Sequence, residues 1–388
     1  MNHTIPEPLP HRSQMNTGTT RPGQGPILVL GGGRNQVGLI RHIEQSGFPV
    51  LVADYLPDSP GHDLASFSSK VSTFDATGAT ALGREHCIRG VITTGTDQPL
   101  VTMADVADTL GLPCYLSPGQ ARLCTDKIRM LAAFSDKGLP VPPYCILQPD
   151  QPMEPQVAAL KFPLVVKPVD SQGQRGVSVV TDHTQLADAA ESALKASVGG
   201  HAIAQQFISG PEITITGWVR DGHFMLGSVT DRHTYNRGPA TGVCFQHVYP
   251  SRQSSVHLET FRELAVAITE VFEIKHGPIY IQCIVSDDSV WLVEATCRLG
   301  GGHEGKLVEF ATGSHFDARL LDLCLTGESS GMQKLPDFPV SGCYNLITFL
   351  LAQPGRFEAL YIADTARGVV QGASYYSRGY CQQTIVDG

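Results

Sequence analysis

The sequence predicts an α/β protein that opens with a doubly wound parallel sheet, continues into an α+β part, and ends in a small β-rich lobe. Three observations predict this fold class. Short apolar runs alternate with helical stretches up to about residue 118, strand-like runs dominate residues 161–250, and glycine-rich turns follow several of the strands. The chain has 388 residues, enough for two to three structural units.

Composition excludes several classes of protein. Hydrophobic residues make up 42% and charged residues 17%, which is typical of a folded globular chain rather than a disordered one. A net charge of −9 does not suit a nucleic-acid binder, and no apolar run approaches the roughly 18 residues of a membrane span. The ten cysteines contain no CxxC pair, which favours reduced thiols and a cytoplasmic location.

The first part of the chain is predicted to be Rossmann-like. Residues 1–24 have no apolar segment of the kind found in secretory signals, and we expect a disordered tail. A strand then runs into three glycines, a helix ends at Gly47, and a second strand follows, which together make a βαβ opening. A strand at 90–95, a helix at 100–110 and a short strand at 112–115 complete this unit.

Two glycine motifs fit poorly with the sites that they resemble. The motif at 31–38 has Gln36 where a dinucleotide fingerprint needs Gly or Ala, so it indicates a tight turn rather than a nicotinamide site. The motif at 300–307 has the spacing of a phosphate-binding P-loop. It carries Leu307 where Ser or Thr belongs, and it follows a hairpin rather than a first strand. Its glycines nevertheless suit close approach of the backbone to a ligand.

Two lysines lie where phosphates could bind. A helix is predicted from about Asp126 to Lys137, with Thr125 as its N-cap and Lys127 in its first turn. A strand at 162–168 ends in Lys167 and opens into a Ser/Gly loop, which supplies a cation and free backbone N–H groups at one point. This pattern favours a polyphosphate, and an exposed hairpin loop is the alternative.

A later hairpin, with strands at 277–285 and 290–296, carries two candidate metal ligands. A three-residue turn at 287–289 would set Gln282 directly opposite Glu294, with both side chains on one face and within reach of the same hard cation. A two-residue turn would put them on opposite faces. The alternative is a hairpin with two incidental polar residues, but an unpaired Glu294 in an apolar strand would be costly.

These pieces, taken in order, resemble the ATP-grasp superfamily of carboxylate–amine ligases, in particular the members with a Rossmann-like N-terminal domain related to biotin carboxylase and carbamoyl phosphate synthetase. The resemblance covers about residues 26–388. The matching segments are GGGRNQVG, GVITTGTDQPL, TDKIRMLAAFSDKGLPVPPY, FPLVVKPVDSQGQRGVSVV, AQQFISGPEITI and IYIQCIVSDDSVWLVEATCRLGGGHEGKLVEFATG. The resemblance implies a Rossmann-like pre-ATP-grasp domain at 25–118, an ATP-grasp domain at 119–330 with a lid at about 125–205, and a C-terminal β-rich lobe at 331–388.

The resemblance also implies how ATP is held. Lys127 and Lys167 match the lysines that contact the phosphates, and Glu212 matches the acid that binds the ribose hydroxyls. The residues that match the mobile phosphate loop are Ser171, Gln172, Gly173 and Gly176, and those that match the adenine hinge are Gln205, Gln206, Phe207 and Ile208.

The metal and catalytic positions follow in the same way. Gln282, Glu294 and Thr296 match the ligands of Mg²⁺, for which Mn²⁺ can substitute. Arg298 matches the arginine that holds the γ-phosphate and the substrate carboxylate, and together with Lys167 it is the predicted catalytic pair. His303 is a candidate base toward the incoming amine, or else binds a backbone carbonyl.

Three positions depart from the family pattern. Thr296 stands where Asn is usual, Gln282 where an acid is commoner, and Gln205 where Glu is frequent. Each change removes negative charge or a strong ligand, so we expect reduced Mg²⁺ affinity or turnover.

The function implied is ATP-dependent activation of a carboxylate as an acyl phosphate and its joining to an amine, with ADP and phosphate as products. A bicarbonate-activating carboxylase and a nucleotide-binding protein with little or no catalysis are the alternatives. The expected partners are a small carboxylate and a small amine, and the resemblance implies a homodimer. A basic loop at 231–242, with Arg232 and Arg237, either covers the acceptor site or is a solvated surface loop.

Overall fold

The computed structural model describes residues 25–171, 174–235, 242–287, 289–329, 335, 338, 343–351, 374–378 and 383–387. The tail expected at 1–24 lies outside these residues, as do the candidate site residues Gln172, Gly173 and Arg237. No helix in the described ranges has the length and apolar character needed to span a bilayer.

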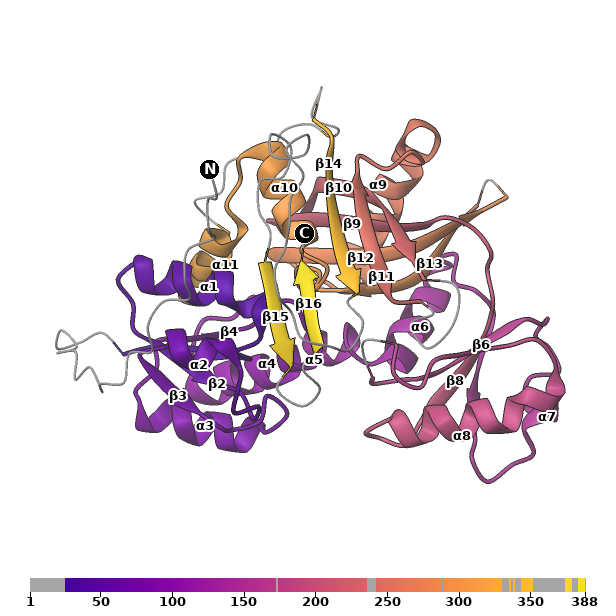
Figure 1. The fold of residues 1–388 in the computed structure, drawn as a ribbon, viewed down its shortest axis with the longest axis horizontal. Coiled ribbons are helices and arrows are strands. Elements are labelled where there is room, and N and C mark those ends of the chain that lie inside the picture. The colour runs from indigo at the N-terminus through magenta and orange to yellow at the C-terminus, as the bar shows by residue number, and fades with distance from the viewer. Residues whose placement is uncertain are drawn as a thin grey trace, which may run out of the picture.

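The N-terminal unit is a four-stranded parallel sheet in the order β3-β2-β1-β4, as predicted for a Rossmann-like domain (Figure 1). All residues of β1 and β2 are buried, since helices cover the sheet. The predicted strand at 112–115 is wrong: these residues are irregular. The elements are β1 (Ile27–Leu30), α1 (Arg34–Gln45), β2 (Val50–Ala53), α2 (Pro60–Leu64), β3 (Phe67–Ser69), α3 (Ala76–Glu85), β4 (Gly90–Ile92), α4 (Pro99–Leu110) and α5 (Pro118–Leu123).

A second, small unit forms an antiparallel sheet in the order β5-β8-β6-β7, with α8 packed against it. Its core is separate from that of the rest of the molecule and includes Leu164, Val166 and Leu186. We call this unit the lid. Its elements are β5 (Tyr144–Leu147), α7 (Met153–Gln156), β6 (Leu164–Pro168), β7 (Ser178–Val180), a 3₁₀ turn (His183–Gln185), α8 (Leu186–Ala196) and β8 (Ala202–Gln206). Helix α6 (Lys127–Asp136) precedes them and buries Met130 and Phe134 in the core of the rest of the molecule.

The third unit is built on an eight-stranded sheet in the order β13-β12-β9-β10-β11-β14-β16-β15. Strands from the predicted C-terminal lobe therefore extend this large sheet, because β14 pairs with β11. The elements are β9 (Glu212–Arg220), β10 (His223–Thr234), β11 (Cys244–Tyr249), α9 (Ser254–Val271), β12 (Gly277–Ser286), β13 (Ser289–Thr296), α10 (Glu304–Thr312), α11 (Phe316–Thr326), β14 (Asn345–Leu351), β15 (Ser374–Arg378) and β16 (Gln383–Asp387).

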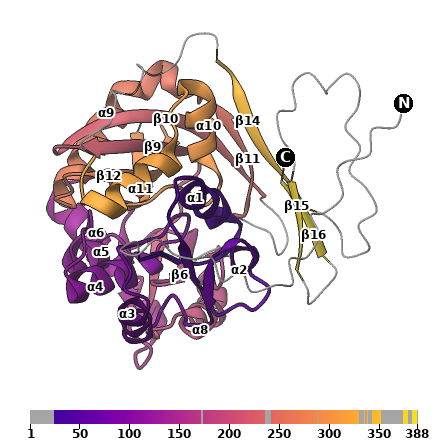
Figure 2. The same cartoon turned by 90° about the vertical axis from the view of Figure 1, so that its left-hand side faces the viewer.

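The N-terminal unit and the large sheet share one hydrophobic core. Helix α11 packs against α1, and the two views show these helices side by side (Figures 1 and 2). The buried Tyr115 hydroxyl donates to the Cys297 carbonyl at 3.0 Å, and this contact ties the first unit to the segment that follows β13. The common core fixes the loops of the N-terminal unit against the end of the β12–β13 hairpin.

Candidate active site

The β12–β13 hairpin places Gln282 opposite Glu294 by a route that the sequence analysis did not foresee. The predicted three-residue turn is wrong: Ser286 pairs with Ser289, so two residues separate the strands. Cys283 pairs with Leu292 but Gln282 pairs with Glu294, so a β-bulge leaves Val293 as the extra residue. The bulge compensates for the short turn. The expectation that a two-residue turn separates the two candidate ligands is therefore wrong as well.

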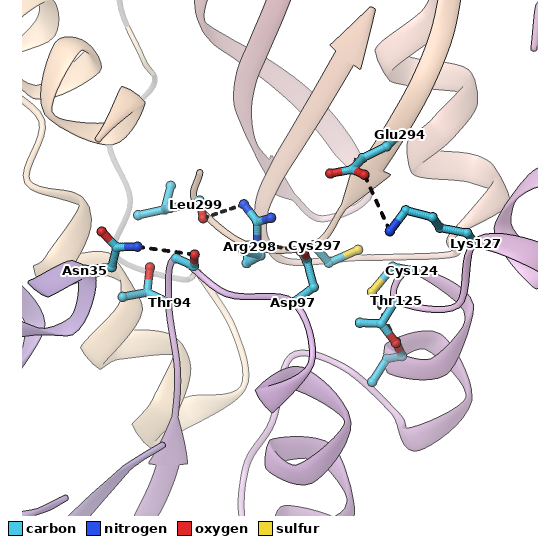
Figure 3. A network of polar contacts seen from close by, with 12 residues as sticks. Asn35, Thr94, Asp97, Cys124, Thr125, Lys127, Glu294, Cys297, Arg298 and Leu299 are labelled. Carbon is cyan, nitrogen blue, oxygen red and sulfur yellow. Dashed lines mark hydrogen bonds and ion pairs between the residues drawn. The ribbon is translucent and has the colours of Figure 1, made fainter. Parts of the chain in front are cut away.

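Lys127 lies beside Glu294. Its helix begins at Lys127, one residue after the predicted start. The N-cap is Asp126 rather than Thr125, because the Asp126 carboxylate accepts from the backbone N–H groups of Ile128 and Arg129. Lys127 Nζ lies 3.8 Å from Glu294 Oε2 and donates to the Ser171 carbonyl at 3.5 Å. Figure 3 shows the two charged side chains facing each other.

Lys167 lies on β6 near the same two residues and is buried. Burial and, to a smaller extent, the nearby charge of Lys127 lower the pKa of its ammonium to about 8, although Glu294 opposes both effects. Lys127, Lys167 and Glu294, which come from a helix and two different sheets, therefore form one charged cluster.

Arg298 follows β13 and forms an ion pair that sequence reasoning missed. Its Nε donates to Asp97 Oδ1 at 2.6 Å, its Nη1 donates to the Leu299 carbonyl at 3.0 Å, and its guanidinium carbon lies 5.0 Å from the centre of the Tyr280 ring. Burial alone would lower the pKa of Arg298, but the Asp97 carboxylate outweighs burial and raises it. Figure 3 shows Asp97 reaching this arginine from the N-terminal unit.

A signal for Asp97 is present in the sequence. Asp97 comes five residues after Ile92, the last residue of the parallel strand β4. Ligands of open parallel sheets commonly bind beyond the carboxyl ends of the strands. An acidic residue at that edge was therefore a candidate for the site, although its partner could not be identified without the fold.

Glu212, the predicted ribose ligand, is fully engaged by other side chains. It accepts from Arg232, from the Thr234 hydroxyl at 3.0 Å and from Gln282 Nε2 at 3.1 Å. The predicted loop at 231–242 is wrong at its start, because Arg232 lies on β10. Arg232 is a partner of the Glu212 carboxylate and is not free at the surface. Through Gln282 the network reaches the hairpin that carries Glu294.

The predicted adenine hinge lies where β8 leaves the lid. Gln205 is buried and donates from its side chain to the Pro142 carbonyl at 3.3 Å. Backbone N–H groups of Gln206 and Phe207 donate to the carbonyls of Pro143 and Pro163 at 2.8 and 2.9 Å. Phe207 is 38% exposed and Ile208 follows the strand, so this segment keeps an apolar side chain accessible at the boundary between the lid and the large sheet.

The loop after β6 approaches α8 closely. The Ser171 hydroxyl donates to the Ala196 carbonyl, so it is used within the lid. Gly176 has φ +70°, and a Cβ there would lie 2.5 Å from that of Ala196, so only glycine fits this position.

His303 stacks on Phe349, with ring centres 6.1 Å apart, and it adopts a left-handed backbone conformation with φ 60° just before α10. A buried pair missed by the sequence analysis lies nearby: His247 Nε2 is 3.2 Å from Glu304 Oε1. Burial lowers the pKa of His247, and the Glu304 carboxylate opposes this shift.

The donor set near the hairpin suits Mg²⁺. No group of three His, Cys, Asp or Glu side chains that could hold a metal occurs in the described ranges. Mg²⁺ bound with nucleotide needs only one or two carboxylates beside the phosphates. Glu294 supplies a carboxylate, and Gln282 uses only its amide nitrogen toward Glu212, which keeps its oxygen as an acceptor. The Thr296 hydroxyl, on the same strand, is buried.

Comparison with known proteins identifies the domain that contains much of this site. Residues 160–305 match the family model of the ATP-grasp domain. A formate-dependent phosphoribosylglycinamide formyltransferase of Burkholderia lata is 28% identical over 301 residues, which cover 74% of this chain and 71% of that protein.

Solved structures agree on the fold. L-amino acid ligase from Bacillus licheniformis superposes with a TM-score of 0.74 at 19% identity, covering 94% of this chain and 93% of that one. The biotin carboxylase domain of Hydrogenobacter thermophilus 2-oxoglutarate carboxylase superposes with a TM-score of 0.73 at 15% identity, covering 94% and 85%. Residues 160–305 therefore form an ATP-grasp domain, and the fold around it is similar to that of these enzymes.

Proposed function

We propose that this protein is an ATP-dependent ligase that activates a carboxylate as an acyl phosphate and joins it to an amine. The observation that carries the proposal is the meeting of Lys127, Lys167, Glu294 and Arg298 beside one hairpin of an ATP-grasp domain. Two lysines can bind phosphates, a carboxylate can bind a metal, and a guanidinium can bind an anionic substrate.

The nucleotide lies between the lid and the large sheet in this proposal. The hinge at Gln205–Ile208 receives the adenine, and Glu212 receives the ribose hydroxyls once Arg232 releases it. Lys127 and Lys167 contact the phosphates, and the loop from Ser171 to Gly176 closes over them. Because Lys167 is buried, its contact with a phosphate acts at short range and with little screening by water.

Glu294 and Gln282, with Thr296 beside them, would hold Mg²⁺, which neutralises phosphate charge when it is bound. The ion pair between Lys127 and Glu294 then has a simple use. Before the nucleotide binds, each side chain compensates the charge of the other. At 3.8 Å the pair is loose, so a ligand can separate it. On binding, Lys127 turns to the phosphates and Glu294 to the cation, and neither charge is buried without a partner.

Arg298 orients the substrate carboxylate for attack on the γ-phosphorus. A carboxylate oxygen forms the new P–O bond, ADP leaves with the electron pair of the broken bond, and the product is an acyl phosphate. The nitrogen of the amine then attacks the acyl carbon, phosphate departs, and an amide remains after the nitrogen loses a proton. His303 is a candidate acceptor of that proton, and the nearby buried pair of His247 and Glu304 is a second candidate acceptor.

Relatives support this reaction class and narrow the substrates to small molecules. One relative is named for formyl transfer to phosphoribosylglycinamide using formate, and a structural neighbour is named an L-amino acid ligase. The acid and the amine of this chain are not fixed by these names. A homodimer stays a prediction of the family resemblance, and a cytoplasmic location stays a prediction from the cysteine pattern.

The test is release of ADP and phosphate from MgATP in the presence of formate, amino acids, hydroxy acids and amines, offered singly and in pairs. The proposal expects release that depends on an acid and an amine together, and loss of that release in Lys167→Ala. Tight nucleotide binding without release for any pair would overturn the ligase and favour a nucleotide-binding protein.

A bicarbonate-activating carboxylase is the second candidate, favoured by the likeness to the biotin carboxylase domain. It predicts release of phosphate with bicarbonate alone, with no requirement for an organic acid. Including bicarbonate among the single additions separates the two enzymes in the same experiment.

A further inference from the structure

We propose that Asp97, contributed by the N-terminal unit, is a positioning residue that holds Arg298 in the orientation in which it binds the γ-phosphate and the substrate carboxylate. This inference rests on the role proposed above for Arg298. If Asp97 has this role, the loop that follows β4 contributes a residue to the active site.

Two nitrogen atoms of the Arg298 guanidinium bind protein groups, and the third is available to a ligand. Nε is held by Asp97 at 2.6 Å, Nη1 by the Leu299 carbonyl at 3.0 Å, and one face lies against the ring of Tyr280. Because the guanidinium is planar and rigid, fixing Nε and Nη1 also fixes the direction of Nη2. Nη2 has no protein partner among the described residues, so it is the edge left for a phosphate or carboxylate oxygen.

Asp97 is itself held firmly. Asn35 Nδ2 donates to the Gly95 carbonyl at 3.5 Å, and Gly95 has φ +75°. A Cβ at Gly95 would lie 2.5 Å from Asn35 Cβ, and one at Gly301 would lie 2.8 Å from the Gly95 carbonyl oxygen. The loop that carries Asp97 therefore packs backbone to backbone on the glycine loop that follows Arg298. This close packing explains glycines at both positions and defines where the carboxylate sits.

Asp97 keeps its charge in this place. Burial would raise the pKa of its carboxyl group, but the charges of Arg298 and Lys127 outweigh burial and lower it. The side chain of Asp97 is 17% exposed and that of Arg298 is 7% exposed, so the pair has little competition from water. An ionised Asp97 also compensates Arg298 while no substrate is bound, so the arginine can stay in the site instead of turning toward solvent.

The experiment compares binding of MgADP, which lacks the γ-phosphate, with binding of the magnesium complex of AMP-PNP, which carries one. Calorimetry gives both dissociation constants for the wild-type chain, for Asp97→Asn and for Asp108→Asn, an exposed aspartate on α4 that serves as the matched control. We expect Asp97→Asn to weaken AMP-PNP by about tenfold and MgADP by no more than about twofold, and Asp108→Asn to change neither. Equal weakening of both nucleotides, or no change in either, would overturn the proposal.

A double-mutant cycle tests whether Asp97 acts through Arg298. Arg298→Lys removes Nε, so adding Asp97→Asn to it should weaken AMP-PNP by less than about twofold more. Fully additive effects would contradict the inference. If Asp97→Asn does not fold, as judged by circular dichroism, Asp97→Glu takes its place, since the longer side chain keeps the charge but displaces the guanidinium. Asp97→Glu should likewise weaken binding of AMP-PNP more than binding of MgADP.

The outcome is separable from that of the ligase test, because nucleotide binding needs no turnover. If the wild-type chain binds both nucleotides but releases phosphate with none of the acid and amine pairs, the ligase proposal is overturned. The comparison of wild type with Asp97→Asn can still be made. A wild-type chain that binds neither nucleotide would end both. Where turnover is found, Asp97→Asn should raise the KM for the acid about tenfold and change the KM for the amine little.

Discussion

Two ion pairs lie side by side in the site, and they differ in kind. Lys127 and Glu294 are 3.8 Å apart, with side chains 16% and 27% exposed. Asp97 and Arg298 are joined by a hydrogen bond of 2.6 Å, with side chains 17% and 7% exposed. Each pair joins an acid and a base from separate elements of the fold (Figure 3).

The difference in distance and exposure indicates which of the two ion pairs a bound nucleotide can separate. A loose, partly solvated pair contributes little to stability and can be broken by a ligand that offers both members better partners. A short, buried, hydrogen-bonded pair would leave a charge stranded if it opened, so it behaves as part of the framework. Lys127 and Glu294 would thus change partners on nucleotide binding, whereas Asp97 and Arg298 stay together.

The largest expected effect comes from removing the acid of the loose pair. Glu294→Ala removes the carboxylate that the hairpin offers to the cation, so turnover of MgATP should fall about a thousandfold. Steady-state release of phosphate measures it, and Glu259→Ala, an exposed glutamate on α9, is the matched control. Turnover within about tenfold of wild type in Glu294→Ala would show that Glu294 is not the metal ligand.

Stability should respond in the opposite order. Asp97→Ala leaves Arg298 buried without its carboxylate and should lower the free energy of unfolding by about 3 kcal/mol. Glu294→Ala removes one side of a loose pair and should change it by less than about 1 kcal/mol. Chemical denaturation of both variants at pH 7 measures the difference. Similar losses in the two variants would remove the distinction between an exchangeable pair and a structural one.

The sequence predicted the loose pair far better than the tight one. Lys127 and Glu294 lie in motifs whose order along the chain resembles the ATP-grasp superfamily, so each could be assigned before the fold was known. Asp97 lies in the matching segment GVITTGTDQPL, but the resemblance assigned it no role, and its partner is 201 residues away. Only the packing of one loop on another brings them together, and that packing depends on the shared core of two units.

The hairpin shows a second limit of sequence reasoning. Gln282 and Glu294 do face each other, but the predicted turn length was wrong and a bulge at Val293 restores the register. A bulge depends on tertiary contacts and on the twist of neighbouring strands, so alternation of polar and apolar residues does not reveal it. The candidate ligands could be found from the sequence, but the reason that they share a face could not.

Nucleotide affinity should depend on pH through Lys167, which lies beside the loose pair. The pKa of its ammonium is about 8 in the free protein, below its ordinary value, because burial and Lys127 disfavour the charge. A bound phosphate favours the charged form, so binding above pH 8 requires uptake of a proton. The dissociation constant of MgADP should therefore be flat below about pH 7.5 and rise about tenfold between pH 7 and pH 9.

The control for this pH dependence is Lys167→Arg, whose guanidinium stays charged throughout this range. Calorimetry at constant ionic strength should give a nearly flat profile for the variant over pH 7–9. A wild-type profile that is equally flat would mean that no phosphate lies near Lys167, or that its ammonium titrates outside this range.

The smallest expected effect concerns the weakest predicted ligand of the cation. Thr296 stands two residues after Glu294, at the position where Asn is usual in ATP-grasp proteins, and an amide oxygen is a better ligand for Mg²⁺ than a hydroxyl. Thr296→Asn should lower the Mg²⁺ concentration for half-maximal turnover by about two- to fivefold. Thr296 also lies near Asp97 and two residues before Arg298, so the variant touches both ion pairs. If the Mg²⁺ requirement is unchanged while AMP-PNP binding weakens, Thr296 supports the tight pair rather than the cation.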